Sequence, residues 1–580
     1  GTRQIVYRFF AERRRLLLVG ITQGTEPVPP ALQVRYGALA DTASPDLDEI
    51  GRVSRRAYPQ LVLADPDAWF AIQEDHEANL ALSFEETEVL FSADANSLSA
   101  GDDVRGFPLF INGRAGSGKS TILQYLFSDY LASYLTMSER PFDPPAYFTY
   151  NSELLERARK VVGSLLRHGA QGMVGGGIRP DFEREQRVLD GSFHQLHRFL
   201  YDLLPTHLKQ TRFKDDSDHK VTYARFKALW REKFGKTASA KEQREFGPDL
   251  SWHVIRTYVK GMSLEPGEPL EPEDYAGLPQ KRRTVTLEAF ERVYSRVYDS
   301  WYRLLGEEGY WDDQDLALAL LEEGIRPRFP AIFCDEAQDF TSLELEVLYR
   351  LSIFSDCSLH GFLSQRVPFV FAGDPFQTLN PTGFSWDAIK ANYTTKLLDN
   401  SNADDGSGRQ INYRELEYNY RSTWPIVRFS NTLQAMRSRL LDVTLAPQSA
   451  WNSGEAAQNP LWYDRADEAV ADQLRRQTEL TIIVPVDEGE EAAYVRDDAL
   501  LSKVVEKDEH GTPMNVLSPM RAKGLEFRRV ALYGFGAAAP ARLMKLIENP
   551  ADMTPEEALP LEYFINRLYV AASRPKRRLF

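Results

Sequence analysis

Short apolar runs recur along the chain, and each ends in a polar or glycine-containing turn. They lie at residues 107–111, 146–150, 331–334, 369–372, 480–484 and 529–533. Runs of this length, bounded by turn residues, are typical of strands buried on both faces of a parallel sheet. Residues 180–310 have a mostly helical pattern. The sequence therefore predicts an α/β fold of parallel sheets flanked by helices, with a helical insertion at about residues 156–310.

The beginning of the chain carries no recognisable chemistry. Residues 5–10 and 16–21 are apolar and flank three arginines, and the second run is predicted as a strand. We interpret residues 1–77 as an N-terminal segment, the expected tail of an upstream domain. The arginines are expected at a solvated strand entrance, with a nucleic-acid contact as the alternative. A helix is expected after Ser83, because Ser83 and Glu86 have the spacing of a capping box.

Length, charge and cysteine content narrow the class of protein. A chain of 580 residues exceeds what one hydrophobic core supports, so several domains are expected. The net charge of −15 does not exclude nucleic acid, because phosphate binding depends on local basic stripes. No stretch approaches the roughly 20 apolar residues of a membrane span, and two cysteines are too few for a disulfide framework. We expect an intracellular protein without membrane contact, with further domains outside this segment.

The first of the apolar runs leads into a complete phosphate-loop motif. Residues 113–120 fit the pattern G-x-x-x-x-G-K-[ST], and an amphipathic helix follows. Glycines in such a loop let backbone N–H groups turn towards phosphate oxygens, and the positive end of the helix adds to the attraction. Lys119 is expected to contact the β- and γ-phosphates, and the Ser120 hydroxyl to hold Mg²⁺. The alternative, a glycine-rich turn that matches by chance, is disfavoured by the strand–loop–helix context.

Two later apolar runs end in residues that would complete this site. One continues directly into Asp335 and Glu336. Asp335 is expected to complete the Mg²⁺ shell, and Glu336 to polarise an attacking water. The next run precedes Gln377, which is expected to sense the γ-phosphate, and Trp386. We interpret Trp386 as a base-stacking face, with a core position as the alternative.

A basic and aromatic tract occupies residues 209–244. Its lysines and arginines are interleaved with Phe213, Tyr223, Phe226, Trp230 and Phe234. Cations that contact phosphates and aromatic faces that stack bases are features of single-strand binding. The alternative is a helical subdomain with these aromatics in its core, and we favour it for most of the five.

Two isolated arginines stand out in the last third of the chain. Arg421 and Arg574 lie far from the phosphate loop in sequence. A cleft between two domains would bring both to the γ-phosphate, where arginines supplied across a cleft stabilise the transition state. We therefore expect a first domain at residues 78–385 and a second, truncated at its C-terminus, at residues 386–580.

Taken together, these motifs resemble those of superfamily 1 helicases of the UvrD/Rep type. The matching segments span residues 80–580 in the family's order and are GRAGSGKST (113–121), YFTYN (147–151), VTYARF (221–226), DEAQD (335–339), GDPFQ (373–377), NYRS (419–422), AKGLEF (522–527) and LYVAASRP (568–575). The resemblance implies two RecA-like P-loop NTPase domains with ATP and Mg²⁺ between them. It also implies single-stranded nucleic acid across their tops and 3′-to-5′ translocation.

The resemblance further assigns roles to individual residues. Nucleotide contacts are expected from Gly113, Ala115, Gly116, Ser117, Gly118, Lys119, Ser120, Thr121, Tyr420, which would stack on adenine, and Glu526, which would hold the ribose. The metal ligands would be Ser120 and Asp335. The catalytic residues would be Lys119, Glu336 as general base, and Gln377, Arg421 and Arg574 at the γ-phosphate. The nucleic-acid track would include Thr149, Asn151, Thr222, Tyr223, Trp386 and Lys523.

The sequence also departs from the family pattern. Where the family has a glutamine that recognises adenine, this chain has Glu86. Where the family has a histidine before the AKGLEF segment, this chain has Met520. The second domain is too short for the family's large accessory insertion. The first expected function is an ATP-hydrolysing helicase or translocase on single-stranded nucleic acid, with DNA favoured over RNA. The alternative is an ATP-dependent switch within a larger protein, with little unwinding.

Overall fold

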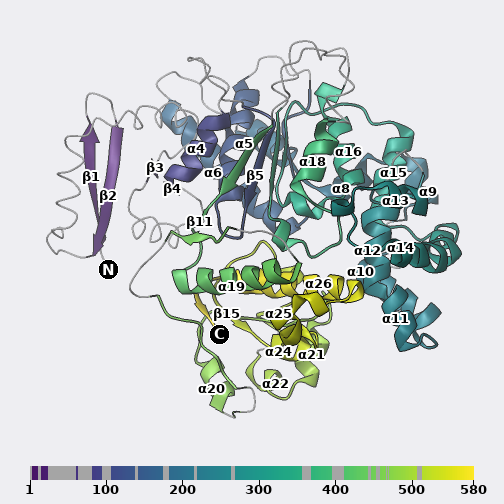
Figure 1. The fold of residues 1–580 in the computed structure, drawn as a ribbon. Coiled ribbons are helices and arrows are strands. Elements are labelled where there is room, and N and C mark those ends of the chain that lie inside the picture. Colours follow the sequence, from purple (N-terminus) through teal and green to yellow (C-terminus); the bar gives the residue numbers. More distant parts are fainter. Residues whose placement is uncertain are drawn as a thin grey trace.

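Two parallel sheets, each flanked by helices, make up the computed structural model of this chain (Figure 1). The structure describes residues 3–10, 15–23, 61–62, 81–93, 106–136, 142–173, 182–214, 219–262, 268–355, 368–394, 411–441, 446–451, 457–464, 467, 469–505 and 513–580. The predicted α/β class is confirmed for this part of the chain. No helix within it is both long and apolar enough to cross a lipid bilayer.

The first sheet has six parallel strands in the order β10-β5-β9-β8-β6-β7. Its strands are β5 (Leu109–Gly113), β6 (Ala146–Thr149), β7 (Phe193–Gln195), β8 (Ile332–Cys334), β9 (Phe369–Gly373) and β10 (Asn412–Leu416). The four inner strands coincide with predicted apolar runs. The two edge strands, β7 and β10, were not predicted, because an edge strand can expose polar residues and so lacks a continuous apolar pattern.

Both faces of this sheet are covered, because successive side chains of a strand point to opposite faces. Leu109 and Ile111 of β5 pack on one face and Phe110 on the other. The first face is covered by α4 (Phe84–Ala93), α5 (Lys119–Thr136) and α6 (Ser152–Met173). The second is covered by α8 (Leu196–Leu203), α15 (Asp313–Glu323), α16 (Ser342–Leu351) and α18 (Trp386–Tyr393).

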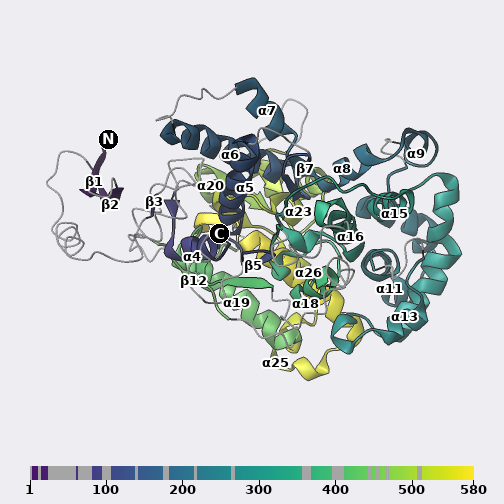
Figure 2. The ribbon, with the colours of Figure 1, turned by 90° about the horizontal axis from the view of Figure 1, so that it is seen from above.

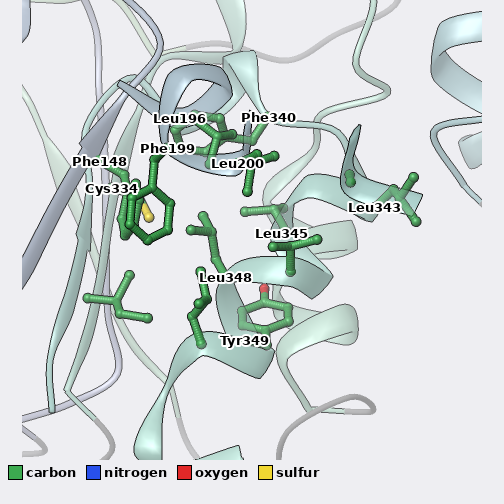
Figure 3. Packing of buried hydrophobic residues seen from close by; sticks show 14 of the residues in the cluster. Phe148, Leu196, Phe199, Leu200, Cys334, Phe340, Leu343, Leu345, Leu348 and Tyr349 are labelled. Atoms are coloured by element: carbon green, nitrogen blue, oxygen red, sulfur yellow. The ribbon is translucent and has the colours of Figure 1, made fainter. Parts of the chain in front are cut away.

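Leucine and aromatic side chains fill the second face (Figure 3). Phe199 of α8 meets Phe148 of β6 edge to face, with ring centroids 5.2 Å apart. Leu345, Leu348 and Tyr349 of α16 continue the layer. Burying one large apolar side chain contributes about 1.5–3 kcal/mol. The layer thus holds α16, which follows the acidic turn after β8, firmly against the sheet.

Trp386 belongs to this same layer, which corrects its predicted role as a base-stacking face. Its side chain is 8% exposed, and its ring lies 6.0 Å from Phe110 and 5.2 Å from Phe384 between centroids. A ring that is almost completely buried among other aromatic side chains has little surface left for a base. The position of Trp386 shortly after Gln377 in the sequence did not reveal this burial. The packing supports the alternative that Trp386 is a core residue.

Residues 221–305 form a helical subdomain with a core of its own at one side of both sheets (Figures 1 and 2). Its helices are α10 (Tyr223–Trp230), η3 (Arg231–Gly235), α11 (Ala240–Phe246), α12 (Pro248–Val254), η4 (Ile255–Val259), α13 (Pro272–Gly277), η5 (Gln280–Arg282), α14 (Leu287–Val293), η6 (Tyr294–Tyr302) and η7 (Arg303–Glu308). Phe226 and Trp230 are buried in this core, as favoured from the sequence. The predicted start of the insertion, about residue 156, is too early, because α6 and β7 belong to the first sheet.

The second sheet has four parallel strands in the order β14-β13-β15-β16. They are β13 (Leu480–Ile483), β14 (Val516–Leu517), β15 (Phe527–Leu532) and β16 (Pro575–Leu579). The helices around it are α19 (Trp424–Leu441), α20 (Ala469–Arg475), α21 (Glu491–Asp497), α22 (Leu501–Val504), α23 (Pro519–Ala522), α24 (Phe535–Ala538), α25 (Leu543–Glu548) and α26 (Pro555–Ala572). The predicted boundary at residue 385 is too early, because α18 and β10 belong to the first sheet.

Shorter elements complete the described chain. They are the antiparallel pair β1 (Arg3–Phe10) and β2 (Arg15–Gln23), the parallel pairs β3 (Leu61–Val62) with β4 (Ala81–Leu82) and β11 (Tyr418–Asn419) with β12 (Ser449–Ala450), helices α7 (Phe182–Asp190) and α9 (Thr206–Thr211), and the turns η8 (Ala337–Asp339), η9 (Ile353–Ser355), η12 (Pro375–Gln377) and η14 (Pro550–Asp552). The strand predicted at residues 16–21 is confirmed as part of β2. The predicted capping box is also present, since Glu86 N–H donates to Ser83 Oγ and Ser83 N–H to Glu86 Oε2.

A buried histidine joins the helical subdomain to α26 and makes stability depend on pH. His253 of α12 shares hydrogen bonds with the Tyr563 hydroxyl through Nδ1 (2.7 Å) and with the Thr284 hydroxyl through Nε2 (2.6 Å). Burial lowers the pKa of His253 to about 3. Between that value and its unfolded pKa of about 6.5, the unfolded chain binds a proton that the folded chain excludes.

We therefore expect the wild-type chain to lose stability as the pH falls below about 6.5, by up to about 1.4 kcal/mol per pH unit from this group. His253→Gln keeps a donor and an acceptor but does not titrate. Urea midpoints at pH 7.5 and 5.5 should fall further for the wild type than for the variant. Equal falls would show that His253 is not the group responsible.

Candidate functional site

A cavity opens where the carboxyl ends of β5 and β8 meet the second sheet. Its lining comprises Glu86, residues 115–121, Gln124, Leu154, Arg157, Asp335, Glu336, Gln377, Tyr420, Arg421, Gly524, Glu526, Arg574 and Lys576. Every nucleotide, metal and catalytic residue predicted from the sequence lies in this lining except Gly113, which ends β5 just beneath it. In open parallel sheets, the carboxyl ends of the strands are the usual place for a ligand.

The phosphate loop connects β5 to α5 and needs its glycines. Gly116 and Gly118 have φ values of 76° and 86°, which only glycine adopts without strain. A Cβ on Gly116 would lie 2.7 Å from Cβ of Arg421, and one on Gly118 would lie 2.2 Å from Glu86 Oε1. The Ser117 hydroxyl is buried and has no hydrogen-bond partner among the described residues. The loop is thus a cradle with unused polar capacity, which suits phosphate oxygens.

Lys119 begins α5 and is almost completely buried. Its Nζ donates to the Arg114 carbonyl oxygen at 3.0 Å across the loop. Burial lowers the pKa of Lys119, while Asp374, Glu336 and Asp335 oppose that shift. A cation held among carboxylates beside glycine N–H groups is an arrangement that binds a polyanion.

Asp335 and Glu336 follow β8 at the bottom of the cavity. The Asp335 carboxylate accepts from the Tyr147 hydroxyl at 2.8 Å and from the Ser120 hydroxyl. Burial and the neighbouring Glu336 raise the pKa of Asp335 to about 6. Glu336 has φ 54°, a strained backbone for a residue other than glycine, and its carboxylate accepts a hydrogen bond from Gln338 Nε2. Burial opposes ionisation of Glu336, but Lys523 and Lys119 outweigh it and hold its pKa below the ordinary value.

The residues around Asp335 fit a magnesium ion. Ser120 and Asp335 supply hydroxyl and carboxylate oxygens, the ligands that Mg²⁺ prefers when phosphates and water complete its shell. Among the described residues there is no cluster of three or more His, Cys, Asp or Glu that could form an all-protein metal site. The donor set is therefore that of a metal brought in together with a phosphorylated ligand.

Arg574 from the second sheet reaches the first through Gln377. Its Nη2 donates to Gln377 Oε1 at 2.6 Å and its Nε to the Val570 carbonyl at 2.8 Å, while Gln377 Nε2 donates to Asp374 at 2.7 Å. The side chain is 1% exposed, and burial together with the charge of Arg421 lowers the pKa of Arg574 to about 9. Gln377 lies in η12, beside the first sheet. It thus hydrogen-bonds Arg574, which lies between α26 and β16 of the second sheet.

Glu526 is the centre of an ion-pair cluster at the rim of the cavity. Its carboxylate lies 2.6 Å from Arg157, 3.1 Å from Arg421 and 2.8 Å from Lys576. Burial is outweighed by these three cations, which hold the pKa of Glu526 well below its ordinary value. In this state the carboxylate predicted to hold a ribose is engaged by protein cations.

Tyr420 and Glu86 stand at the opposite rim. The Tyr420 hydroxyl accepts from Ser83 and donates to Glu85, both at 2.8 Å. Burial raises the pKa of Glu86 to about 8, and its carboxyl packs on Gly118. A carboxyl that is neutral at pH 7 has one O–H donor and one acceptor, as an amide has.

Sequence reasoning missed the residues that hold the phosphate loop from the other side. Asn419 Nδ2 and Gln448 Nε2 donate to the Ala115 carbonyl at 2.9 and 3.3 Å, and Tyr420 N–H donates to the Gly116 carbonyl at 2.7 Å. Asn419 belongs to the NYRS segment, and that motif could have drawn attention to it. Gln448 lies in no motif. Tyr147, which orients Asp335, was also missed because it lies inside an apolar strand.

A larger groove of about 850 Å³ runs between the first sheet, the helical subdomain and the second sheet. Its lining includes Thr149, Asn151, Thr222, Tyr223 and Lys523, five of the six predicted track residues. Glu336 and Leu154 line both the groove and the smaller cavity. The two cavities therefore share a wall at the acidic turn after β8.

Many cations of this groove already have acidic partners. Lys523 pairs with Asp339, and Lys220 lies 3.0 Å from Asp313. Arg256 and Arg567 lie 3.8 Å from Glu344 and 2.6 Å from Asp487. Basic residues counted in the sequence therefore overstate the positive charge that the groove presents.

No protein-family model matches this chain, and no curated protein matches it either. The function of the chain is therefore to be inferred from the chemistry of the two cavities.

Proposed function

We propose that the chain hydrolyses ATP between two RecA-like domains and uses the cycle to move along single-stranded nucleic acid. One observation carries the proposal: the phosphate loop, the Asp335–Glu336 pair, Arg421 from the segment before α19 and Arg574 from the turn before β16 meet in one cavity. Each of these parts is known in phosphoryl-transfer sites, and their combination supports hydrolysis rather than binding alone. The preference for DNA and for 3′-to-5′ movement follows the family resemblance.

In this proposal each residue has a separate role in ATP hydrolysis. The loop N–H groups and Lys119 bind the phosphates, and Ser120 and Asp335 hold Mg²⁺. When bound, Mg²⁺ neutralises phosphate charge. Glu336, kept anionic by neighbouring lysines, accepts a proton from the attacking water. Arg421 and Arg574 are supplied from the second domain and stabilise charge on the transferred phosphoryl group.

The groove supports coupling of hydrolysis to a strand. Glu336 lines it as well as the nucleotide cavity, and Lys523 of the second domain pairs with Asp339, three residues beyond Glu336. Closure of the second domain around ATP would therefore move Lys523 and its neighbours at the groove. Aromatic side chains such as Tyr223 and Tyr563 offer surfaces for bases.

The paired cations favour a second candidate function. A track whose lysines and arginines already contact carboxylates has less to gain from phosphates than an unpaired basic stripe. An ATP-dependent switch, in which closure signals to another domain with little unwinding, fits that balance. RNA as the track also stays open, because stacking surfaces accept either nucleic acid.

Steady-state ATP hydrolysis by the full chain tests the two functions against each other. If the chain is a motor, oligo(dT) or oligo(U) should raise the rate several-fold, because a strand in the groove completes the closed state. Duplex DNA should raise it less. Glu336→Gln, which loses the base, reports any contaminating activity. If no nucleic acid raises a measurable wild-type rate, the motor proposal fails and the switch replaces it.

Two substitutions separate binding from chemistry. Lys119→Ala removes a cation that contacts phosphate before and during the reaction, so affinity for Mg²⁺·ATP should fall by a factor of ten or more, about 1.4 kcal/mol. Glu336→Gln keeps the shape of the site, so ATP should bind with nearly wild-type affinity and not turn over. Titration with a fluorescent ATP analogue measures both. Equal losses of affinity would show that these roles are assigned wrongly.

A further inference from the structure

One carboxylate at the groove is held between two cations from different parts of the chain. Asp487, in the turn after β13, accepts a hydrogen bond from Lys227 of α10 and lies 2.6 Å from Arg567 of α26. Lys227 also lies 3.5 Å from Glu490. The three groups therefore connect the helical subdomain, the second sheet and its last helix at one point.

This cluster borders the groove, with Lys227 reaching the lining through its contact with Asp487. Asp487 and Arg567 both line it, together with Tyr223. The Lys227 ammonium stands over the Tyr223 ring, 5.3 Å from its centroid. An anion held by a lysine and an arginine beside an aromatic face has the surroundings that a phosphodiester meets in single-strand binding sites.

The charge state of Asp487 agrees with this comparison. Burial alone would raise the pKa of Asp487, but Arg567 and Lys227 outweigh it and hold the pKa below its ordinary value. The side chain is therefore an anion at neutral pH. It neutralises two cations that would otherwise give the groove a local positive potential.

We propose that Lys227 and Arg567 form a phosphate-binding subsite of the groove, and that Asp487 occupies it as an internal substitute for phosphate. The ligand follows from the proposed function and is the phosphodiester backbone of single-stranded nucleic acid. An incoming strand exchanges its phosphates for the Asp487 carboxylate. Asp487 thereby weakens binding of the strand. It also keeps the two cations from making unspecific contacts.

A purely structural clasp between the helical subdomain and the second sheet predicts a different outcome. In a clasp, removing any of the three groups loosens the groove, and all three variants weaken strand binding. In a masked phosphate subsite, removing the anion strengthens binding and removing either cation weakens it. The sign of the Asp487 effect therefore distinguishes the two.

The test measures affinity of the full chain for a short fluorescent oligo(dT), in a salt series between about 50 and 200 mM. Asp487→Asn frees Arg567 and leaves Lys227 with Glu490 at 3.5 Å. We expect its affinity at low salt to rise about five-fold or more. Its log–log salt slope should stay close to that of the wild type, because the same cations contact phosphates once the strand is bound. Lys227→Gln and Arg567→Gln should weaken binding and flatten the slope. Asp472→Asn, an exposed acid of α20 paired with Arg475, removes the same charge elsewhere and should leave affinity unchanged.

The outcomes separate this proposal from the proposed function. If wild type binds oligo(dT) and Asp487→Asn matches Asp472→Asn or binds more weakly, the subsite is overturned while the motor stands. If neither wild type nor Asp487→Asn binds oligo(dT) or oligo(U) at any salt, both proposals fall. Opposite signs for the acid and the two cations, with thermal midpoints near wild type, establish the subsite.

Discussion

Compensation of buried charge in the cavity between the two sheets is the constraint on which their arrangement depends. Removing an ion from water costs several kcal/mol unless partners replace the water. Lys119 of the first sheet is surrounded by three carboxylates that follow β8 and β9 of the same sheet, and Arg574, which precedes β16 of the second sheet, is satisfied by Gln377 of the first. The second sheet therefore depends on the first for a partner of its buried arginine. The second sheet is therefore held where its arginines face the phosphate loop, which is also what phosphoryl transfer requires.

The sequence predicted the inner strands, and most of the residues that it singled out for the phosphate site line one cavity, for separate physical reasons. Strands buried on both faces must be apolar throughout, so β5, β6, β8 and β9 were visible as runs. The loop glycines and Lys119 could be recognised because a phosphate-loop motif accepts few other residue types at those positions. Their meeting with Arg421 and Arg574 was predicted from a cleft between two domains, and the cavity lining agrees with that prediction.

What the sequence did not reveal depends on burial and pairing, which no local pattern encodes. Trp386 has the chemistry of a stacking residue but lies against Phe110 in the core. The polar edge strands β7 and β10 escaped notice, and so the domain limits were placed too early. Gln448 holds the phosphate loop without belonging to any motif. The basic tract suggested an open cationic surface, whereas Lys220 and Lys227 of that tract are each paired with an acid.

The central claim is that both sheets contribute to one nucleotide site. Hydrogen–deuterium exchange of the full chain, with and without Mg²⁺ and a non-hydrolysable ATP analogue, tests it most directly. The account predicts slower exchange in the phosphate loop at residues 113–121 and also at residues 419–422, whose backbone and side chains contact that loop. Slower exchange in the phosphate loop alone, with residues 419–422 and Arg574 unchanged, would contradict it.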